Sequence, residues 1–307
     1  MGFGSRQSRS LLALRDDLER DNVHMESVPF GLSQNLLEQC DAVFVIGPTR
    51  AFSKSEAEAF AEYLRDGGNL LFALDPVILR QRVMPTGLEE MLKGFGIDVA
   101  DNIVVEHDES LLPQKSPLER FFVTHYGTHP ATQELIGSNA PLVMHQAREI
   151  NAEEGSGAIS ILQTSTKAST LSDLQALNTL LEGKATTKAA RSVSLAAATT
   201  VYVNAAHGEN NGTKGVAKGR VAVVGDSDFL SSSYLDAPEL TNFYIASALT
   251  GWLSQRESLI SIPPKKINRA QLDLSVADLD VLWWRVVVLL PSFSLLLGLL
   301  VWWRRRA

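Results

Sequence analysis

The sequence DAVFVIGPTRAFSKSEAEAFAEYLRDGGNLLFALDP, residues 41–76, predicts a strand, a helix and a second strand. Residues 41–48 form a short apolar run that is typical of a strand buried on both faces. Ser53 and Glu56 predict a capping box at the start of the helix, and a pair of glycines predicts its end. The apolar run 69–76 follows at once. Strands joined through a helix in this way indicate a parallel sheet covered by helices.

The same alternation extends on both sides of this stretch. Thr86 and Glu89 predict a second capped helix, and "IDVADNIVVE", residues 97–106, is predicted to be a strand. The pattern weakens from about 108 to 219, a region that we interpret as an elaboration of the domain. A buried strand then returns at residue 220. The predicted fold class is α/β, a mainly parallel, flavodoxin-like sheet with helices on both faces. Further predicted elements are helices at 8–21, 170–184 and 238–257, the last one amphipathic, and strands at 140–150, 157–165 and 193–203.

Composition excludes several functions. The chain has 307 residues, of which 45% are hydrophobic, so it can bury a sizeable core. Its 28 basic and 35 acidic side chains provide no basic field for nucleic acid. Cys40 is the single cysteine, so it makes no internal disulfide, and its place before a strand suits a small core residue rather than a nucleophile. No phosphate-cradling G-x-x-x-x-G-K-[ST] motif occurs, and no cofactor is expected.

Acidic residues follow two of the predicted strands. Asp75 ends the run "ALDP", and Asp226 and Asp228 lie in "GDSDF" directly after a buried strand. Ligands gather at the carboxyl ends of parallel strands, so these carboxylates could converge on a magnesium ion or a polar ligand. The alternative is that they accept backbone hydrogen bonds in their turns and cap the helices that follow. We favour the alternative.

The sequence contains two patterns that resemble enzyme sites. Ser227, in "GDS", resembles the start of lipases of the GDS type, but all six histidines precede it, which excludes the order of the residues in those enzymes. A triad in another order stays open. His125 and His129 have the i, i+4 spacing of helical metal ligands, but Gly127 and Pro130 argue against a helix. We therefore expect a structural turn there and no metal site.

The C-terminal segment predicts a membrane anchor. Residues 286–303 are 18 positions without a charge, which span about 27 Å as a helix. Tryptophan pairs flank this run and three arginines follow it, an arrangement typical of a bilayer span and less typical of a buried core helix. The flanking residues are Trp283, Trp284, Trp302 and Trp303, followed by Arg304, Arg305 and Arg306. The expected organisation is a domain over 1–257, a linker over 258–282, and a transmembrane helix with a basic tail over 283–307.

The distribution of basic residues predicts the orientation of this span. One arginine stands on its upstream side and three stand downstream, so the C-terminus is expected in the cytoplasm and the large domain outside. The first 30 residues contain no apolar run of signal length, and no strand precedes the first predicted helix. We therefore expect that the chain lacks its beginning.

Several motifs together resemble one family. Residues 41–76, the "GTHP" at 127–130, and the segments 220–234, 242–265 and 289–306 are similar, in this order, to the GldG-like auxiliary components of uncharacterised, gliding-motility-type ABC transport systems. This resemblance covers almost the whole chain. It implies an extracytoplasmic domain related in fold to class I glutamine amidotransferases, without their catalytic residues, and anchored in the inner (plasma) membrane of a bacterium.

Two functions are consistent with the sequence. The resemblance implies a non-catalytic auxiliary or binding subunit of an ABC-type transport system, which would work with a permease and a separate ATPase. The alternative is a membrane-tethered hydrolase that uses the acidic turns at the strand ends. The two differ in whether Asp75, Asp226, Asp228 and a histidine converge in one cleft.

Overall fold

The structure is a computed structural model. It describes residues 10–27, 37, 39–113, 118–172, 190–203, 216–255, 291–292 and 301–306. The chain divides into two compact units, residues 1–265 and residues 266–307, which are described separately.

The first unit is built on a six-stranded sheet with the order β1-β2-β14-β13-β11-β8. Half of this sheet is parallel, because β1 pairs with β2 and β2 with β14 in parallel. The pairs β14–β13, β13–β11 and β11–β8 are antiparallel. The prediction of a mainly parallel sheet is therefore correct only for the half that the first motif builds. The bounds are β1 Val43–Ile46, β2 Asn69–Ala73, β8 His125–Tyr126, β11 Ile159–Gln163, β13 Ser194–Val203 and β14 Val216–Val224.

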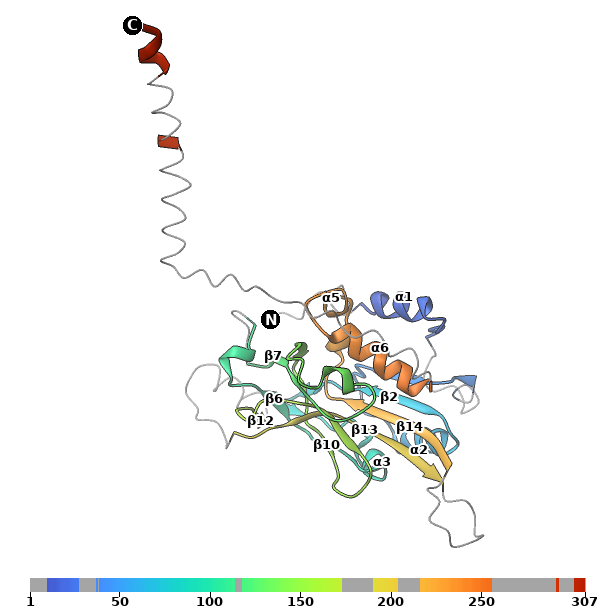
Figure 1. Cartoon of the computed structure of the whole chain (residues 1–307). Helices are drawn as coiled ribbons and strands as arrows, with labels where there is room; N and C mark the ends of the chain where they lie inside the picture. The colour runs from blue at the N-terminus through green and yellow to red at the C-terminus, as the bar shows by residue number, and fades with distance from the viewer. Residues whose placement is uncertain are drawn as a thin grey trace. The chain divides into compact units, whose positions relative to one another are not determined.

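Helices cover both faces of this sheet, as predicted (Figure 1). Side chains alternate along β2, so that Leu70 and Phe72 belong to one core while Leu71 and Ala73 belong to the other. The first core lies under α2 and α3, and the second lies under α1 and α6. The helices are α1 Leu12–Arg20, α2 Lys54–Arg65, α3 Glu89–Lys93, α5 Ser232–Leu235 and α6 Asn242–Leu253.

The predicted helix start is confirmed at α2, whereas α3 begins at Glu89, later than the predicted capping box at Thr86 would place it. At α2 the Ser53 hydroxyl accepts from the backbone N–H of Glu56 at 3.3 Å, and the Glu56 carboxylate accepts from the N–H of Ser53 at 2.7 Å. Before α3 the Glu89 carboxylate accepts from the N–H groups of Thr86 and Gly87. The bonds at α2 satisfy donors that a helix start leaves without intrahelical partners. The bonds of Glu89 fix the turn that leads into α3, where Leu88 makes no side-chain capping bond.

Two predicted features of the sheet and its cover are wrong. The strand β1 is only partly buried along its length, because within the described residues it pairs on one side only, with β2. Helix α6 is not amphipathic, since the polar residues Asn242 and Thr250 are buried while Phe243 is 40% exposed. A helix whose polar residues are buried and whose exposed side includes a phenylalanine has no distinct polar face.

Smaller strand pairs surround the central sheet. The predicted strand 97–106 is interrupted at a turn near Asp101, and its two parts, β5 and β6, pair in separate two-stranded sheets. The region 108–219 supplies three strands of the central sheet and four of the eight strands in these pairs. Their bounds are β3 Ile78–Leu79, β4 Arg82–Val83, β5 Ile97–Val99, β6 Ile103–Val105, β7 Arg120–Val123, β9 Leu142–His145, β10 Ile150–Ala152 and β12 Ser169–Leu171. Short 3₁₀ turns are η3 Glu109–Leu111, η4 Gln133–Leu135 and η5 Asp228–Leu230.

The second unit is described only in part. Residues 291–292 and 301–306 are helical, the Trp302 and Trp303 side chains are exposed, and the guanidinium of Arg306 lies 4.4 Å from the centre of the Trp302 ring. Most of the predicted span 286–303, the predicted linker, and residues 173–184 of another predicted helix lie outside the described residues. Among the residues that are described, no helix has both the length and the apolarity that a membrane crossing requires.

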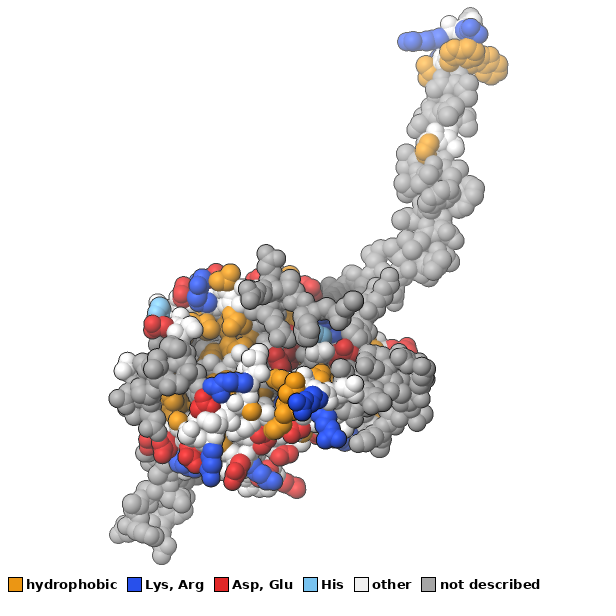
Figure 2. Space-filling model, turned by 180° about the vertical axis from the view of Figure 1, so that it is seen from behind, with side chains coloured by type: hydrophobic (Ala, Val, Ile, Leu, Met, Phe, Trp, Pro, Cys, Tyr) orange, Lys and Arg blue, Asp and Glu red, His pale blue; other side chains and the backbone are white. Residues whose placement is uncertain are grey.

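The surface carries charges of both signs. Figure 2 shows acidic and basic side chains interspersed over the visible face of the described part, with no single field of one sign. This distribution agrees with the net charge of −7.

Candidate functional site

The three carboxylates singled out in the sequence lie together at one edge of the sheet. Asp75 comes just after β2, and Asp226 and Asp228 come just after β14. Because β2 and β14 are parallel neighbours, with Ala73 beside Val224, their carboxyl ends meet. His145, at the end of β9, completes the group. We call Asp75, His145, Asp226, Ser227 and Asp228 the strand-end cluster.

Asp75 joins the two parallel strands through Ser227. Its Oδ1 accepts from the backbone N–H of Ser227 at 2.6 Å, and its Oδ2 accepts from the hydroxyl Oγ of Ser227 at 2.8 Å. Gly47, which follows β1, lies against this pair with φ +57°, and a Cβ there would lie 2.8 Å from Oγ of Ser227. The three parallel strands therefore meet at one hydrogen-bonded contact.

Asp226 is completely buried and both its oxygens accept backbone hydrogen bonds. Oδ1 accepts from the N–H of Asp228 at 2.7 Å, and Oδ2 accepts from the N–H of His145 at 2.8 Å. Burial raises the pKa of Asp226 well above its ordinary value, and the carboxylates of Asp75 and Asp228 raise it further. The two hydrogen bonds oppose this shift in pKa. Asp226 thus ties the end of β9 to the turn after β14.

The more accessible part of the cluster is a histidine–carboxylate pair. Nδ1 of His145 lies 3.0 Å from Oδ2 of Asp228, and the two side chains are 24% and 14% exposed. Ser227 precedes η5, and its side chain makes no capping bond. Asp226 instead accepts from the N–H of Asp228, the first residue of η5. The backbone hydrogen bonds of Asp226 therefore agree with the structural interpretation, including a bond to the start of the turn that follows.

Arg148 borders the cluster and was not identified from the sequence. Its side chain is fully buried, and NH2 donates to the backbone oxygens of Asp75 at 3.2 Å and Met84 at 3.3 Å. NH1 lies 3.7 Å from Oδ1 of Asp101. Burial lowers the pKa of Arg148, and nearby carboxylates, Asp101 most strongly, oppose this. Only the apolar surroundings of "HQAREI" could have indicated a buried arginine.

The glycine of "GDSDF" allows this arginine to approach. The N–H of Arg148 donates to the carbonyl of Gly225 at 2.8 Å. A Cβ on Gly225 would lie 2.1 Å from the carbonyl oxygen of Arg148. No side chain fits at such a distance, so this position in the motif is explained by the contact between two backbone segments.

The hydrogen bonds of the cluster argue against a serine nucleophile. The hydroxyl of Ser227 has one proton, and it donates that proton to Asp75. The imidazole of His145 is engaged by a different carboxylate, Asp228. A nucleophilic serine instead needs a base that accepts its proton and is oriented by a third group. Within the described part of the chain, no group of three or more His, Cys, Asp or Glu side chains could hold a metal ion.

The other sequence candidates lie apart from the cluster. His125 is on the short strand β8, and His129 follows in a turn, so the pair is not helical. His129 packs with its ring centre 4.6 Å from that of Trp252, and burial lowers its pKa to about 4. Cys40 is partly exposed before β1 rather than in the core.

A second buried carboxylate, also missed in the sequence, has a structural role. Glu106 is fully buried after β6, and its oxygens accept from the N–H groups of His107 and Asp108 at 2.9 Å each. They also accept from the hydroxyl of Ser165 at 2.8 Å and from its N–H at 3.1 Å. These partners satisfy Glu106 within the fold.

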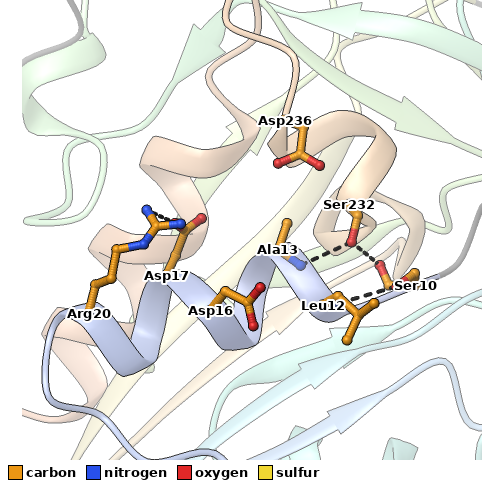
Figure 3. Close-up of a pocket in the computed structure, with 8 residues that line it drawn as sticks. All are labelled: Ser10, Leu12, Ala13, Asp16, Asp17, Arg20, Ser232 and Asp236. Atoms are coloured by element: carbon orange, nitrogen blue, oxygen red, sulfur yellow. Dashed lines mark hydrogen bonds and ion pairs between the residues drawn. The ribbon is translucent and has the colours of Figure 1, made fainter.

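A surface cavity of about 290 Å³ lies between α1 and α5 (Figure 3). The Ser232 hydroxyl donates to the carbonyl of Ser10 at 2.7 Å and accepts from the N–H of Ala13 at 3.1 Å. Burial raises the pKa of Asp17, Arg20 lowers it, and Asp236 raises it. None of the strand-end cluster lines this cavity. The lining residues are Ser10, Leu12, Ala13, Asp16, Asp17, Arg20, Ser232 and Asp236.

The fold and the cluster define an α/β domain in which the carboxylates at the strand ends bind neighbouring parts of the same chain. The chain belongs to the family described as "ABC-type uncharacterized transport system", whose model matches residues 4–247. It is therefore an auxiliary component of an ABC-type transport system. No curated protein matches it.

Solved structures show similarity in fold. The mmIFT52 N-terminal domain is similar with a TM-score of 0.56 and 18% identity, over 82% of this chain and 93% of that one. The exo-beta-1,4-mannosidase Op5Man5 from Opitutaceae bacterium strain TAV5 matches with a TM-score of 0.37 and 14% identity, over 81% of this chain and 31% of that one. At such identities the first similarity indicates a shared fold and nothing about function.

Proposed function

We propose that this protein is a membrane-anchored, non-catalytic auxiliary or binding subunit of a GldG-like, gliding-motility-type ABC system. The family match over residues 4–247 carries this proposal. In it, residues 283–307 anchor the chain in the plasma membrane and the large domain faces outward. The apolar run, its tryptophan flanks and the arginine tail support this arrangement. A permease and a separate ATPase are the proposed partners, since the chain has no P-loop of its own.

In this proposal the main role of the strand-end cluster is to stabilise the fold. Asp75 and Asp226 each use both oxygens within the fold, which leaves them little capacity for a ligand. A polar ligand would reach the cluster at His145 and Asp228, whose side chains are partly exposed. Of the three candidate binding residues Asp75, Asp226 and Asp228, we therefore propose that Asp228 would contact a ligand.

Topology and partners can be tested with the full chain in its native host. A tagged chain should sediment with membranes, protease added to spheroplasts should digest the domain, and the tag should co-purify a permease together with a P-loop ATPase. A domain that is protected, while an outward-facing control protein is cut, would contradict the orientation. Purification of the chain without either partner under mild detergent would contradict the assignment as a subunit.

The hydrolase alternative is tested by Ser227→Ala. The variant loses one hydrogen bond to Asp75, so we expect a small loss of stability and unchanged complementation of a deletion strain. Ser160→Ala is a control on a different strand, because its hydroxyl also bonds polar side chains, that of Ser194 at 2.6 Å and, as acceptor, that of Gln163 at 3.3 Å. A Ser227→Ala protein that melts like the control but fails to complement would favour the hydrolase.

A further inference from the structure

The hairpin formed by β3 and β4 has an exposed tip. Leu79 pairs with Arg82, and the two residues between them, Arg80 and Gln81, have φ values of +50° and +68°. Such a two-residue turn is usually made by Asn-Gly, since other residues are strained at positive φ. All four residues are exposed. The geometry of the turn therefore does not explain why these residue types occur at the tip.

The two faces of the hairpin differ in character. Ile78 and Val83 are opposite each other and pack into a small core with β6. Because side chains alternate along a strand, Leu79, Arg82 and Met84 share the outer face. Leu79 is 56% exposed and Met84 is 36% exposed. The outer face thus combines apolar and basic groups with no cover among the described residues.

The base of the hairpin is held firmly. The N–H of Met84 donates to the carbonyl of Val77 at 2.8 Å. The buried Arg148 donates through NH2 to the carbonyls of Asp75 and Met84, one before the hairpin and one after it. The base of the hairpin is therefore fixed by Arg148, which bonds the chain on both sides of it.

The arginines of the tip differ from other exposed arginines. Arg50 forms an ion pair with Glu56 at 2.6 Å, and Arg191 forms one with Glu149 at 2.7 Å. The side chains of Arg80 and Arg82 form no hydrogen bond or ion pair with the described part of the chain. Two arginines beside exposed leucine and methionine match the chemistry of a surface that contacts anionic lipid headgroups.

We propose that this hairpin tip docks on an anionic lipid bilayer. Leu79 and Met84 enter the headgroup boundary, and Arg80 and Arg82 bind lipid phosphates. The proposal rests on the membrane anchor proposed above, which would keep the weakly binding tip at a high local concentration near the bilayer. A bilayer is favoured over an acidic peptide because all four residues of the tip are exposed and because apolar side chains accompany the arginines.

The test uses the full chain reconstituted in liposomes, either zwitterionic or containing about 30% phosphatidylglycerol, a share at which each basic residue contributes measurably. In a Cys40→Ser background, Leu79→Cys carries an environment-sensitive dye, and spin-labelled lipid quenches dye that enters the headgroup region. Tyr202→Cys is the matched control, since Tyr202 is 55% exposed against 56% for Leu79. We expect strong quenching at Leu79 in anionic liposomes and none at Tyr202.

Charge variants show whether the arginines act through their charge. Arg80→Gln with Arg82→Gln should lower the docked-to-undocked ratio about 30-fold, and Arg80→Lys with Arg82→Lys should retain most of it. Because the tip is exposed, both variants should melt like the parent protein. Equal quenching at Leu79 in zwitterionic and anionic liposomes would overturn the proposal, as would equal docking of the glutamine and lysine variants.

The outcomes separate this proposal from the proposed anchor. A chain that does not float with liposomes contradicts the anchor. A chain that floats while the dye at Leu79 stays unquenched in anionic liposomes overturns lipid docking alone. If that dye is shielded only when the co-purified permease is present, the tip binds a protein, and lipid docking is again overturned.

Discussion

Replacing the buried Asp226 tests whether the strand-end cluster holds the fold together. Asp226→Ala leaves two buried N–H groups, those of His145 and Asp228, without their acceptor, at about 1–3 kcal/mol each. The expected loss in the free energy of unfolding is therefore about 2–6 kcal/mol. Asp226→Asn keeps one oxygen but turns an NH₂ group toward the other N–H, so it should cost about 1–3 kcal/mol.

The cost of Asp226→Asn should depend on pH. The pKa of Asp226 is raised above the ordinary 3.8, so the folded protein holds this proton more tightly than the unfolded chain. The resulting stability is fully present below pH 3.8 and declines as the pH rises toward the folded pKa. The Asp226→Asn variant has no carboxyl group to titrate, so it lacks this pH-dependent contribution to stability. The difference between wild type and variant should therefore be largest at about pH 3.5 and should narrow toward pH 7.

Urea unfolding of the full chain in detergent, followed by the fluorescence of the buried Trp252, would measure both quantities between pH 3.5 and 7. Asp66→Asn, an exposed substitution after α2, is the control and should stay within about 0.5 kcal/mol of wild type. Identical pH dependence in wild type and Asp226→Asn would refute the raised pKa. An Asp226→Ala protein as stable as wild type would refute the structural role of the cluster.

Three further substitutions test the fold. Gly225→Ala should lower the free energy of unfolding by about 2–3 kcal/mol, because its Cβ would lie 2.1 Å from the Arg148 carbonyl oxygen; an unchanged melting temperature would contradict this. Because the pKa of His129 is lowered to about 4, the wild-type protein should lose at most about 3 kcal/mol of stability as the pH falls from 6.5 to about 4. His129→Gln should remove this loss, and a pH profile of urea unfolding identical to that of the wild type would count against it. Val223→Asp, in a completely buried strand, should destabilise by about 3 kcal/mol or more, and Val45→Asp, at the partly buried β1, by about 1–2 kcal/mol; melting temperatures in the reverse order would refute the strand positions.

Local signals were sufficient for the first half of the sheet. The capping box of Ser53 and Glu56 and the apolar run that follows Asn69 in β2 are encoded within a few residues. The antiparallel half was not foreseen, because a buried strand has the same side-chain pattern whatever the direction of its neighbour. The interruption of residues 97–106 near Asp101 depends on pairing with β10 and β12, which lie far along the chain.

The candidate site was foreseen only in its acidic members. Asp75, Asp226 and Asp228 follow recognisable strands, so their meeting could be expected from a parallel sheet. His145 and Arg148 reach the same place from a region where no helix–strand alternation guides the prediction. Their contacts are tertiary, and a single sequence carries no signal of such pairs.

The pairing of β2 with β14 has a consequence for biosynthesis. The N–H of Arg220 bonds the side chain of Asn69, 151 positions earlier, at the start of this parallel pair. A ribosome therefore releases β2 long before its central neighbour exists, and closing so long a loop is slow. Until residues 216–224 emerge, β2, which is apolar after Asn69, has an open edge that can pair with other nascent chains. Translation that stops before β14 should therefore yield aggregates rather than a smaller folded domain, and the complete chain depends on protection of this edge during synthesis.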